Sequence, residues 1–172
     1  MKIRTSPCLI ALGAFAIVAC VSTRQPRAIA AQQGAQCDAN VGEKEVLDAA
    51  NVERVAPLYA HVNSGPNGYE ARLAGAQITV RPDGTSPEAL AHALRCYEAL
   101  HVLRGDAPVV ADPFVLPNDW VDIDAKTDGA RLIVSVRSES YGGGQQVLQR
   151  ATARYHVGGD VAQDPSSVVH GP

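Results

Sequence analysis

The residues most able to do chemistry in this chain are a cysteine and two histidines within one stretch of helical spacing. His92 and Cys96 are four residues apart, so on a helix they share a face and could both reach one metal ion. His101 lies five residues beyond Cys96 and would point elsewhere. A complete site would need another ligand, from His61, His156 or Asp124. The structural alternative, which we favour, puts Cys96 in a disulfide and His92 on a solvated face.

Two further groups of residues could bind ions. Asp119, Asp122, Asp124 and Asp128 form an acidic cluster of the kind that calcium prefers. Their spacing matches no calcium-binding loop, so we expect a solvated sheet face with a turn aspartate. Gly142-Gly143-Gly144 could offer backbone amides to an anion. The run lacks the lysine of a P-loop and the glycine spacing of a dinucleotide-binding motif. We therefore expect a permissive connection, in which the glycines only give the backbone freedom to turn between two elements.

The sequence shows no catalytic set. Ser138 and Ser140 lie in no G-x-S-x-G elbow, and the five histidines are scattered. The net charge of −3 and the aromatic content of 5% give no basic patch or stacking platform for nucleic acid. We therefore predict a protein that is not an enzyme, has no cofactor, and does not bind nucleic acid.

The first twenty residues resemble a bacterial lipoprotein signal. Lys2 and Arg4 precede an uncharged apolar run of signal-peptide length, which is too short to span a membrane. The run ends in Ile17-Val18-Ala19-Cys20, which resembles a lipobox and predicts lipidation of Cys20. The alternative is cleavage after Ala28-Ile29-Ala30, which would release a soluble periplasmic or secreted protein. We favour the lipobox because cleavage normally follows the apolar core directly.

Export also bears on the four cysteines of the chain. Cys8 leaves with the signal and Cys20 would carry the lipid, so Cys37 and Cys96 remain. In an oxidising compartment such a pair is expected to form a disulfide. A free Cys96 thiol is the alternative, and the metal-binding hypothesis depends on it.

The helices and strands that position these residues are predicted from the spacing of the apolar residues and from the glycines and prolines that interrupt it. The spacing of Leu47, Ala50 and Leu58 favours a helix, and Pro57 would divide that helix in two. The expected elements are two short helices within Glu43–Val62 that break near Val55, a strand at Ala76–Arg81, a helix at Ser86–Arg104, strands at Trp120–Lys126 and Arg131–Glu139 joined at Asp128-Gly129, and a helix at Gln145–Tyr155.

This order predicts an α+β fold. A right-handed crossover makes the first two strands parallel, and the third fits between them. The result is a split βαβ, ferredoxin-like βαββα(β) sandwich with an N-terminal helical segment, in which the optional last strand is a stub at Tyr155–Val157. The predicted organisation is a signal peptide at 1–20, a flexible tether at 21–42, one domain at 43–157 with its core at 74–157, and a disordered tail at 158–172.

Several short motifs carry a resemblance to known proteins. They are Leu73-Ala74-Gly75-Ala76, Val80-Arg81, Leu94-Arg95-Cys96, Asp112-Pro113-Phe114 and Leu148-Gln149-Arg150-Ala151. With them the chain resembles a group of small, exported, functionally uncharacterised bacterial envelope proteins. In that group a histidine often follows the cysteine, whereas Tyr97 stands here, a departure that weakens a metal role.

Together these features predict a non-enzymatic envelope lipoprotein that faces the periplasm and acts as a small binding or adaptor module. Its partner would be an envelope protein or a small ligand, and it would touch the membrane through its lipid alone. Val21 after the lipid cysteine resembles the signal for outer-membrane sorting. The alternative is a periplasmic metal-binding or metal-sensing protein that uses His92, Cys96 and His101 to hold a transition-metal ion.

Overall fold

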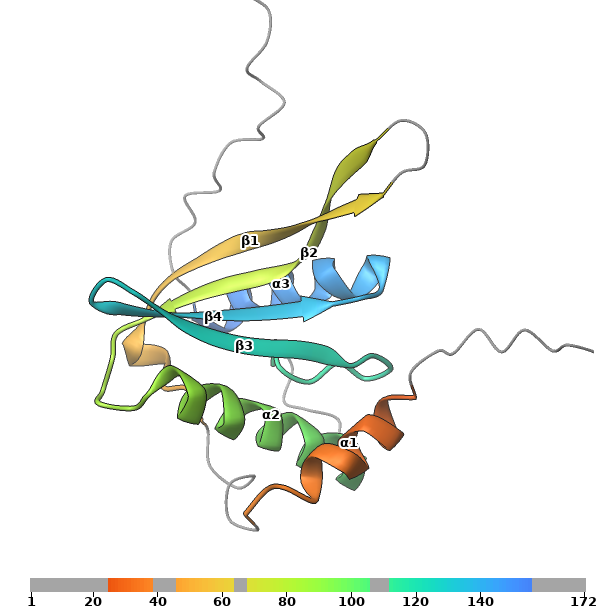
Figure 1. The fold of residues 1–172 in the computed structure, drawn as a ribbon, viewed down its shortest axis with the longest axis horizontal. Coiled ribbons are helices and arrows are strands. Elements are labelled where there is room, and N and C mark those ends of the chain that lie inside the picture. Colours follow the sequence, from red (N-terminus) through yellow and green to blue (C-terminus); the bar gives the residue numbers. More distant parts are fainter. Residues whose placement is uncertain (1–24, 39–45, 64–67, 106–111, 156–172) are drawn as a thin grey trace, which may run out of the picture.

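A computed structural model describes residues 25–38, 46–63, 68–105 and 112–155 (Figure 1). The elements, in chain order, are α1 (Pro26–Gly34), the 3-10 turn η1 (Ala49–Asn51), β1 (Val52–Asn63), β2 (Tyr69–Val80), α2 (Pro87–Arg104), β3 (Val121–Asp128), β4 (Arg131–Ser138) and α3 (Tyr141–Tyr155). The predicted α+β class is confirmed, with a four-stranded sheet and helices packed against it. The signal peptide at 1–20 and the tail at 158–172 lie outside the described residues.

The strands lie in the order β1-β2-β4-β3, and every neighbouring pair is antiparallel. β4 lies between β2 and β3, as the sequence predicted for the corresponding three segments. The place beside β2 is taken by β1, which precedes β2 in the chain, and not by a C-terminal strand. Tyr155 ends α3, and the remainder of the predicted stub, residues 156–157, falls outside the described ranges.

The prediction of two short helices within residues 43–62 is wrong for the described part, because residues 52–63 form β1. Val52, Val55 and Tyr59 are residue types that favour a strand, and pairing with β2 outweighs the helical spacing of the apolar positions. Pro57 is tolerated because β1 is an edge strand, where a missing N–H removes no hydrogen bond from the sheet interior.

The helix predicted at 86–104 is confirmed as α2. The Ser86 hydroxyl accepts a hydrogen bond of 3.2 Å from the backbone N–H of Ala89, which caps the first turn. Gly105 ends the helix with φ of 71°, a left-handed conformation that glycine adopts without strain. Its backbone N–H donates to the His101 carbonyl at 3.0 Å.

The predicted β3–β4 hairpin is also confirmed, with its turn one residue later than expected. Asp128 pairs with Arg131, so Gly129 and the residue after it form the loop, and Gly129 has φ of 59°. Ile123 lies opposite Val136. This register puts the alternating apolar residues of both strands on one face of the sheet.

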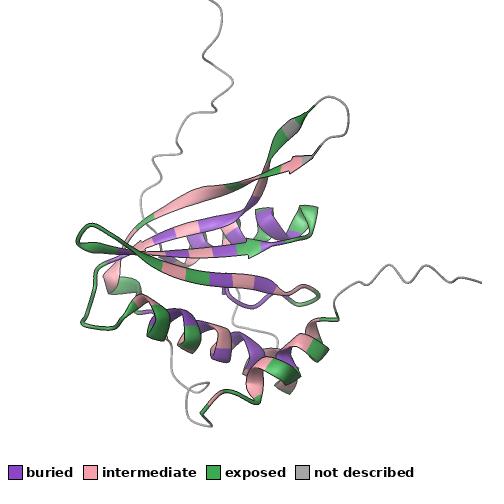
Figure 2. Ribbon diagram, in the orientation of Figure 1, coloured by how far each residue is buried: buried purple, intermediate pink, exposed green. Residues whose placement is uncertain are grey.

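The core lies between that face and a layer formed by α2, α3 and residues 114–116 (Figure 2). Both helices contribute to one continuous cluster with the strands, through residues such as Leu94 on α2 and Val147 on α3. The opposite face of the sheet carries polar and charged side chains, and in Figure 1 no helix covers it.

Residues 25–38 differ from the predicted flexible tether, because α1 packs across the C-terminal end of α2 (Figure 1). Ala30 is fully buried, and an Arg27 guanidinium nitrogen donates to the Leu103 carbonyl at 3.4 Å. The sequence pattern hid this contact because α1 is rich in alanine and glutamine and carries little apolar surface. The rest of the predicted tether lies outside the described ranges.

α3 begins at Tyr141 and not at Gln145, so the glycine run forms its first turn. A Cβ atom on Gly144 would lie 2.6 Å from the Leu73 carbonyl oxygen and 2.8 Å from the carbonyl carbon of Ala74. A Cβ on Gly143 would collide with the Asp119 carboxylate. The expected role as a permissive connection is therefore wrong for these two glycines, which allow α3 to approach the sheet closely.

Candidate functional site

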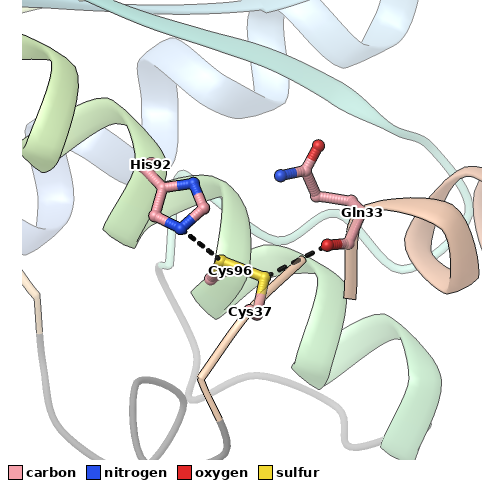
Figure 3. The surroundings of a disulfide bond; sticks show 4 residues. All are labelled: Gln33, Cys37, His92 and Cys96. Atoms are coloured by element: carbon pink, nitrogen blue, oxygen red, sulfur yellow. Dashed lines mark hydrogen bonds between the residues drawn. A yellow bond between two sulfur atoms is a disulfide. The ribbon is translucent and has the colours of Figure 1, made fainter. Parts of the chain in front are cut away.

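Cys37, just after α1, and Cys96 on α2 lie at disulfide distance, with 2.02 Å between the Sγ atoms and 5.6 Å between the Cα atoms (Figure 3). This agrees with the predicted pair. Cys96 is fully buried, and the bond joins the end of α1 to the middle of α2. It therefore makes α1 part of the folded domain.

The residues of the metal-binding hypothesis are only partly brought together. His92 Nε2 lies 3.7 Å from Cys96 Sγ (Figure 3), whereas the His101 ring packs against Tyr97 with centroids 4.4 Å apart. A disulfide sulfur is not the thiolate that binds a metal ion. In the described part of the chain, no three His, Cys, Asp or Glu side chains gather as a metal site would require. Metal binding stays a prediction that needs a reduced Cys96.

The acidic cluster separates into ion pairs and one hydrogen-bonded network. Asp122 lies 3.6 Å from Arg137, and Asp124, whose side chain is 80% exposed, lies 3.8 Å from Arg95. Such exposed pairs contribute little to stability. Asp119 differs, because it lies before β3 at the base of α3.

The Asp119 carboxylate organises the start of α3. Its Oδ2 accepts hydrogen bonds from the hydroxyls of Ser138 and Ser140, the latter at 2.6 Å. Its Oδ1 accepts from the Trp120 backbone N–H at 2.9 Å. The Ser140 hydroxyl in turn accepts from the Gly143 N–H at 3.0 Å and so caps the helix. The sequence analysis missed this network because 19 and 21 residues separate Asp119 from the two serines.

A cleft of about 570 Å³ opens beside this network. It lies between the start of α1, the turn before β3, the end of β4 and the first turn of α3. Its lining combines apolar and polar groups, including Pro26, Asn118, Asp119, Trp120, Ser140 and Gln146. Trp120 is half-buried and lines this cleft together with Pro26 of α1.

The described residues that line the cleft offer hydrogen-bonding groups, carboxylates and one aromatic ring. The Ser140 hydroxyl donates its one hydrogen to the Asp119 carboxylate and accepts from the Gly143 N–H, so it has no second hydrogen to donate to a ligand. The described lining residues include no histidine, lysine or cysteine beside a serine. Asp119, Asp122 and Glu139 give the lining a negative character. Such a lining favours a neutral or cationic polar group over an anion.

Behind the cleft, Glu98 of α2 is fully buried against the start of β3. Its Oε1 accepts a hydrogen bond of 2.9 Å from the Val121 N–H, and its Oε2 has no hydrogen-bond partner among the described residues. Burial raises the pKa of Glu98 well above its usual value, and the neighbouring carboxylates of Asp122 and Asp119 raise it further. The Val121 hydrogen bond opposes this rise. Burial therefore favours the protonated form of Glu98 over the charged form.

The motifs behind the sequence resemblance have structural roles here. Asp112 accepts from the Tyr97 hydroxyl at 2.6 Å and from the Phe114 N–H at 2.8 Å. Arg150 of α3 donates to the carbonyls of Asp112 and Val115 at 3.3 and 3.0 Å. These contacts hold the buried segment at residues 112–115, which precedes β3 in the chain, against α2 and α3.

No family model, no curated protein and no solved structure matches this chain. The resemblance to exported envelope proteins therefore stays a prediction.

Proposed function

We propose that this chain is a non-enzymatic envelope lipoprotein, anchored through Cys20, whose domain binds a neutral or cationic polar ligand or peptide segment in the cleft beside Trp120. The observation that carries the proposal is the cleft itself, which is large enough for a small ligand and combines an aromatic ring with several polar groups. The ligand would come from the envelope, either as a small molecule or as part of a protein.

The placement of α1 supports the lipobox over the rival cleavage site. Cleavage after Ala30 would remove the first half of α1, including Pro26 in the cleft and Arg27 at the end of α2. Cleavage before Cys20 would leave the whole helix in the mature protein. The proposed location is the periplasmic side of the outer membrane, from the residue type of Val21.

The finer description of the fold is part of the same proposal. β2, α2, β3 and β4 follow the predicted split βαβ order, and α3 then packs on the same face as α2. β1 fills the place beside β2 that a C-terminal strand would fill in a ferredoxin-like sheet. The domain would thus be a rearranged ferredoxin-like sandwich, a fold that by itself assigns no function.

A cleft-filling variant tests the proposed binding site. A Cβ on Gly142 would meet nothing within 4 Å, so Gly142→Phe adds bulk at the cleft without disturbing the core. Gln149→Phe adds the same ring to an exposed position of α3 outside the cleft lining. The intact lipoprotein and both variants are incubated with envelope extract under mild crosslinking, and the retained molecules are identified by mass spectrometry.

The wild type and Gln149→Phe should retain the same molecule, and Gly142→Phe should lose it. Equal retention by all three proteins would assign binding to another surface. If the wild type retains nothing specific in repeated experiments, the proposal of a binding module is wrong.

A further inference from the structure

The length of chain between the proposed lipid and the folded domain limits how the domain can sit on the membrane. α1 begins at Pro26, six residues after Cys20. At 3.3–3.6 Å per residue, that connection spans at most roughly 20 Å. A tether over all of residues 21–42 would have reached roughly 75 Å by the same measure. A domain of this size has a radius of gyration of roughly 13 Å, so the connection is short compared with the width of the domain.

The end of the domain nearest the anchor carries exposed positive charge. Arg27 lies in the first turn of α1, which contains no acidic residue. Its side chain reaches the Leu103 carbonyl, and Arg104, also exposed, follows directly at the end of α2. Arg27 lies at the positive end of the α1 dipole, and its guanidinium satisfies one of the last carbonyls of α2. We call Arg27 and Arg104 the arginine pair.

We infer that the arginine pair is a membrane-contacting surface, which binds the phosphates of anionic lipid headgroups and holds the α1 end of the domain on the bilayer. This inference rests on the proposed lipid anchor at Cys20. A lipid chain together with basic residues is a combination that gives firm membrane attachment. The cleft is also lined by Pro26, so it would open close to the membrane surface.

The single tryptophan of the chain provides a reporter, because Trp120 lines the cleft together with Pro26. The full-length lipidated protein is reconstituted into vesicles of phosphatidylethanolamine and phosphatidylglycerol, or of phosphatidylcholine alone. Both carry lipids with a nitroxide on the headgroup, which quenches nearby tryptophan fluorescence. The variants are Arg27→Gln with Arg104→Gln, and an insertion of ten Gly and Ser residues between Gln25 and Pro26.

Lys126→Gln is the matched control, because Lys126 is exposed near the β3–β4 turn, at the opposite end of the domain from α1 (Figure 1). Circular dichroism checks that each variant is folded. A series of salt concentrations on the wild type gives a second measure of the electrostatic contact, since salt screens exposed charges.

The inference predicts stronger quenching of Trp120 in the anionic vesicles than in the neutral ones. Quenching should fall in the double arginine variant, in the insertion variant and at high salt, and should be unchanged in Lys126→Gln. Vesicle-bound protein whose Trp120 is unquenched, or equally quenched in every variant and lipid, overturns the orientation alone. Protein that does not float with the vesicles overturns the lipid anchor, and this inference with it.

Discussion

Glu98 on α2 accepts a hydrogen bond of 2.9 Å from the backbone N–H of Val121, on the side of β3 that faces away from β4. One turn earlier on α2, Arg95 Nε donates to the Ile123 carbonyl at 2.8 Å. Two side chains of one helix therefore satisfy successive backbone groups along an edge of the sheet. An edge bound in this way is closed to pairing with another chain.

Replacing Glu98 with glutamine should remove a pH dependence of stability. The pKa of Glu98 is raised in the folded protein above its usual value of 4.5, which the unfolded chain keeps. The folded state therefore holds a proton that the unfolded state releases, and this contribution is complete below about pH 4.5 and is lost as the pH rises through the raised pKa. Glu98→Gln keeps an acceptor for Val121 and cannot ionise.

Urea unfolding across pH 4–9 checks this prediction. Glu98→Gln should match the wild type at the acid end and exceed its free energy of unfolding at the alkaline end. Glu70→Gln, at an exposed position of β2, is the control and should follow the wild-type profile. A difference between Glu98→Gln and the wild type that is constant with pH would mean that Glu98 does not titrate as described.

The two glycines in the first turn of α3 should respond oppositely to alanine. Gly144→Ala places a Cβ 2.6 Å from the Leu73 carbonyl oxygen, so it should destabilise the domain by about 1–3 kcal/mol through overpacking. A Cβ on Gly142 meets nothing within 4 Å, so Gly142→Ala should be neutral or stabilising by up to about 1 kcal/mol. Thermal unfolding of both variants measures the difference, and equal effects would contradict the close packing of α3 on β2.

Asp119→Ala should weaken the start of α3. It removes the acceptor of the Ser138 and Ser140 hydroxyls and of the Trp120 N–H, and leaving such donors unpaired destabilises by about 1–3 kcal/mol. Trp120 fluorescence should shift as well, because the ring lies next to the altered site. Asp124→Ala at the exposed pair with Arg95 is the control, with an expected change within about 0.5 kcal/mol. Similar losses in both variants would assign Asp119 no special role.

Removing the disulfide should lower the free energy of unfolding strongly, because the sequence separation of Cys37 and Cys96 is 59 residues. The chain-entropy argument gives roughly 4 kcal/mol for a loop of that length, so Cys37→Ser should lower the free energy of unfolding by about that amount. Thiol labelling of the unreduced, denatured mature protein should find neither cysteine reactive. A labelled Cys96 would contradict the disulfide and would return the metal-binding alternative to consideration.

The parts of the fold with strong local signals could be predicted from the sequence. The Ser86 cap and the Gly105 stop define α2, and the alternating residues around Gly129 define the β3–β4 hairpin. β1 could not be predicted, because its apolar residues fit helical spacing as well, and pairing with β2 decides between the two. α1 was missed because its only apolar contact surface is alanine and isoleucine, and the helix it packs on lies far along the chain.

The candidate site was harder to predict than the fold. The cleft joins segments far apart in the chain, from Pro26 to Gln146, that no motif connects. One signal was available, since the hairpin register places Ser138 opposite Val121 and therefore close to Asp119. The cysteine pair was accessible to sequence reasoning because the predicted lipoprotein signal accounts for the other two cysteines. In contrast, the role of the glycine run could be recognised only from the structure, because only packing against Leu73 and Ala74 distinguishes Gly144 from a loop glycine.

Both the proposed function and the membrane orientation depend on one covalent feature, the lipid on Cys20. Its direct test is the intact mass and N-terminal sequence of the mature protein, expressed in a Gram-negative host and recovered from separated membrane and soluble fractions, with Cys20→Ala as the matched variant. The account predicts a membrane-bound wild type that begins at Cys20 and carries the added mass of its acyl chains. Cys20→Ala should remain an uncleaved precursor or appear as a soluble species. A wild type that is soluble and begins at Ala31 would contradict the account.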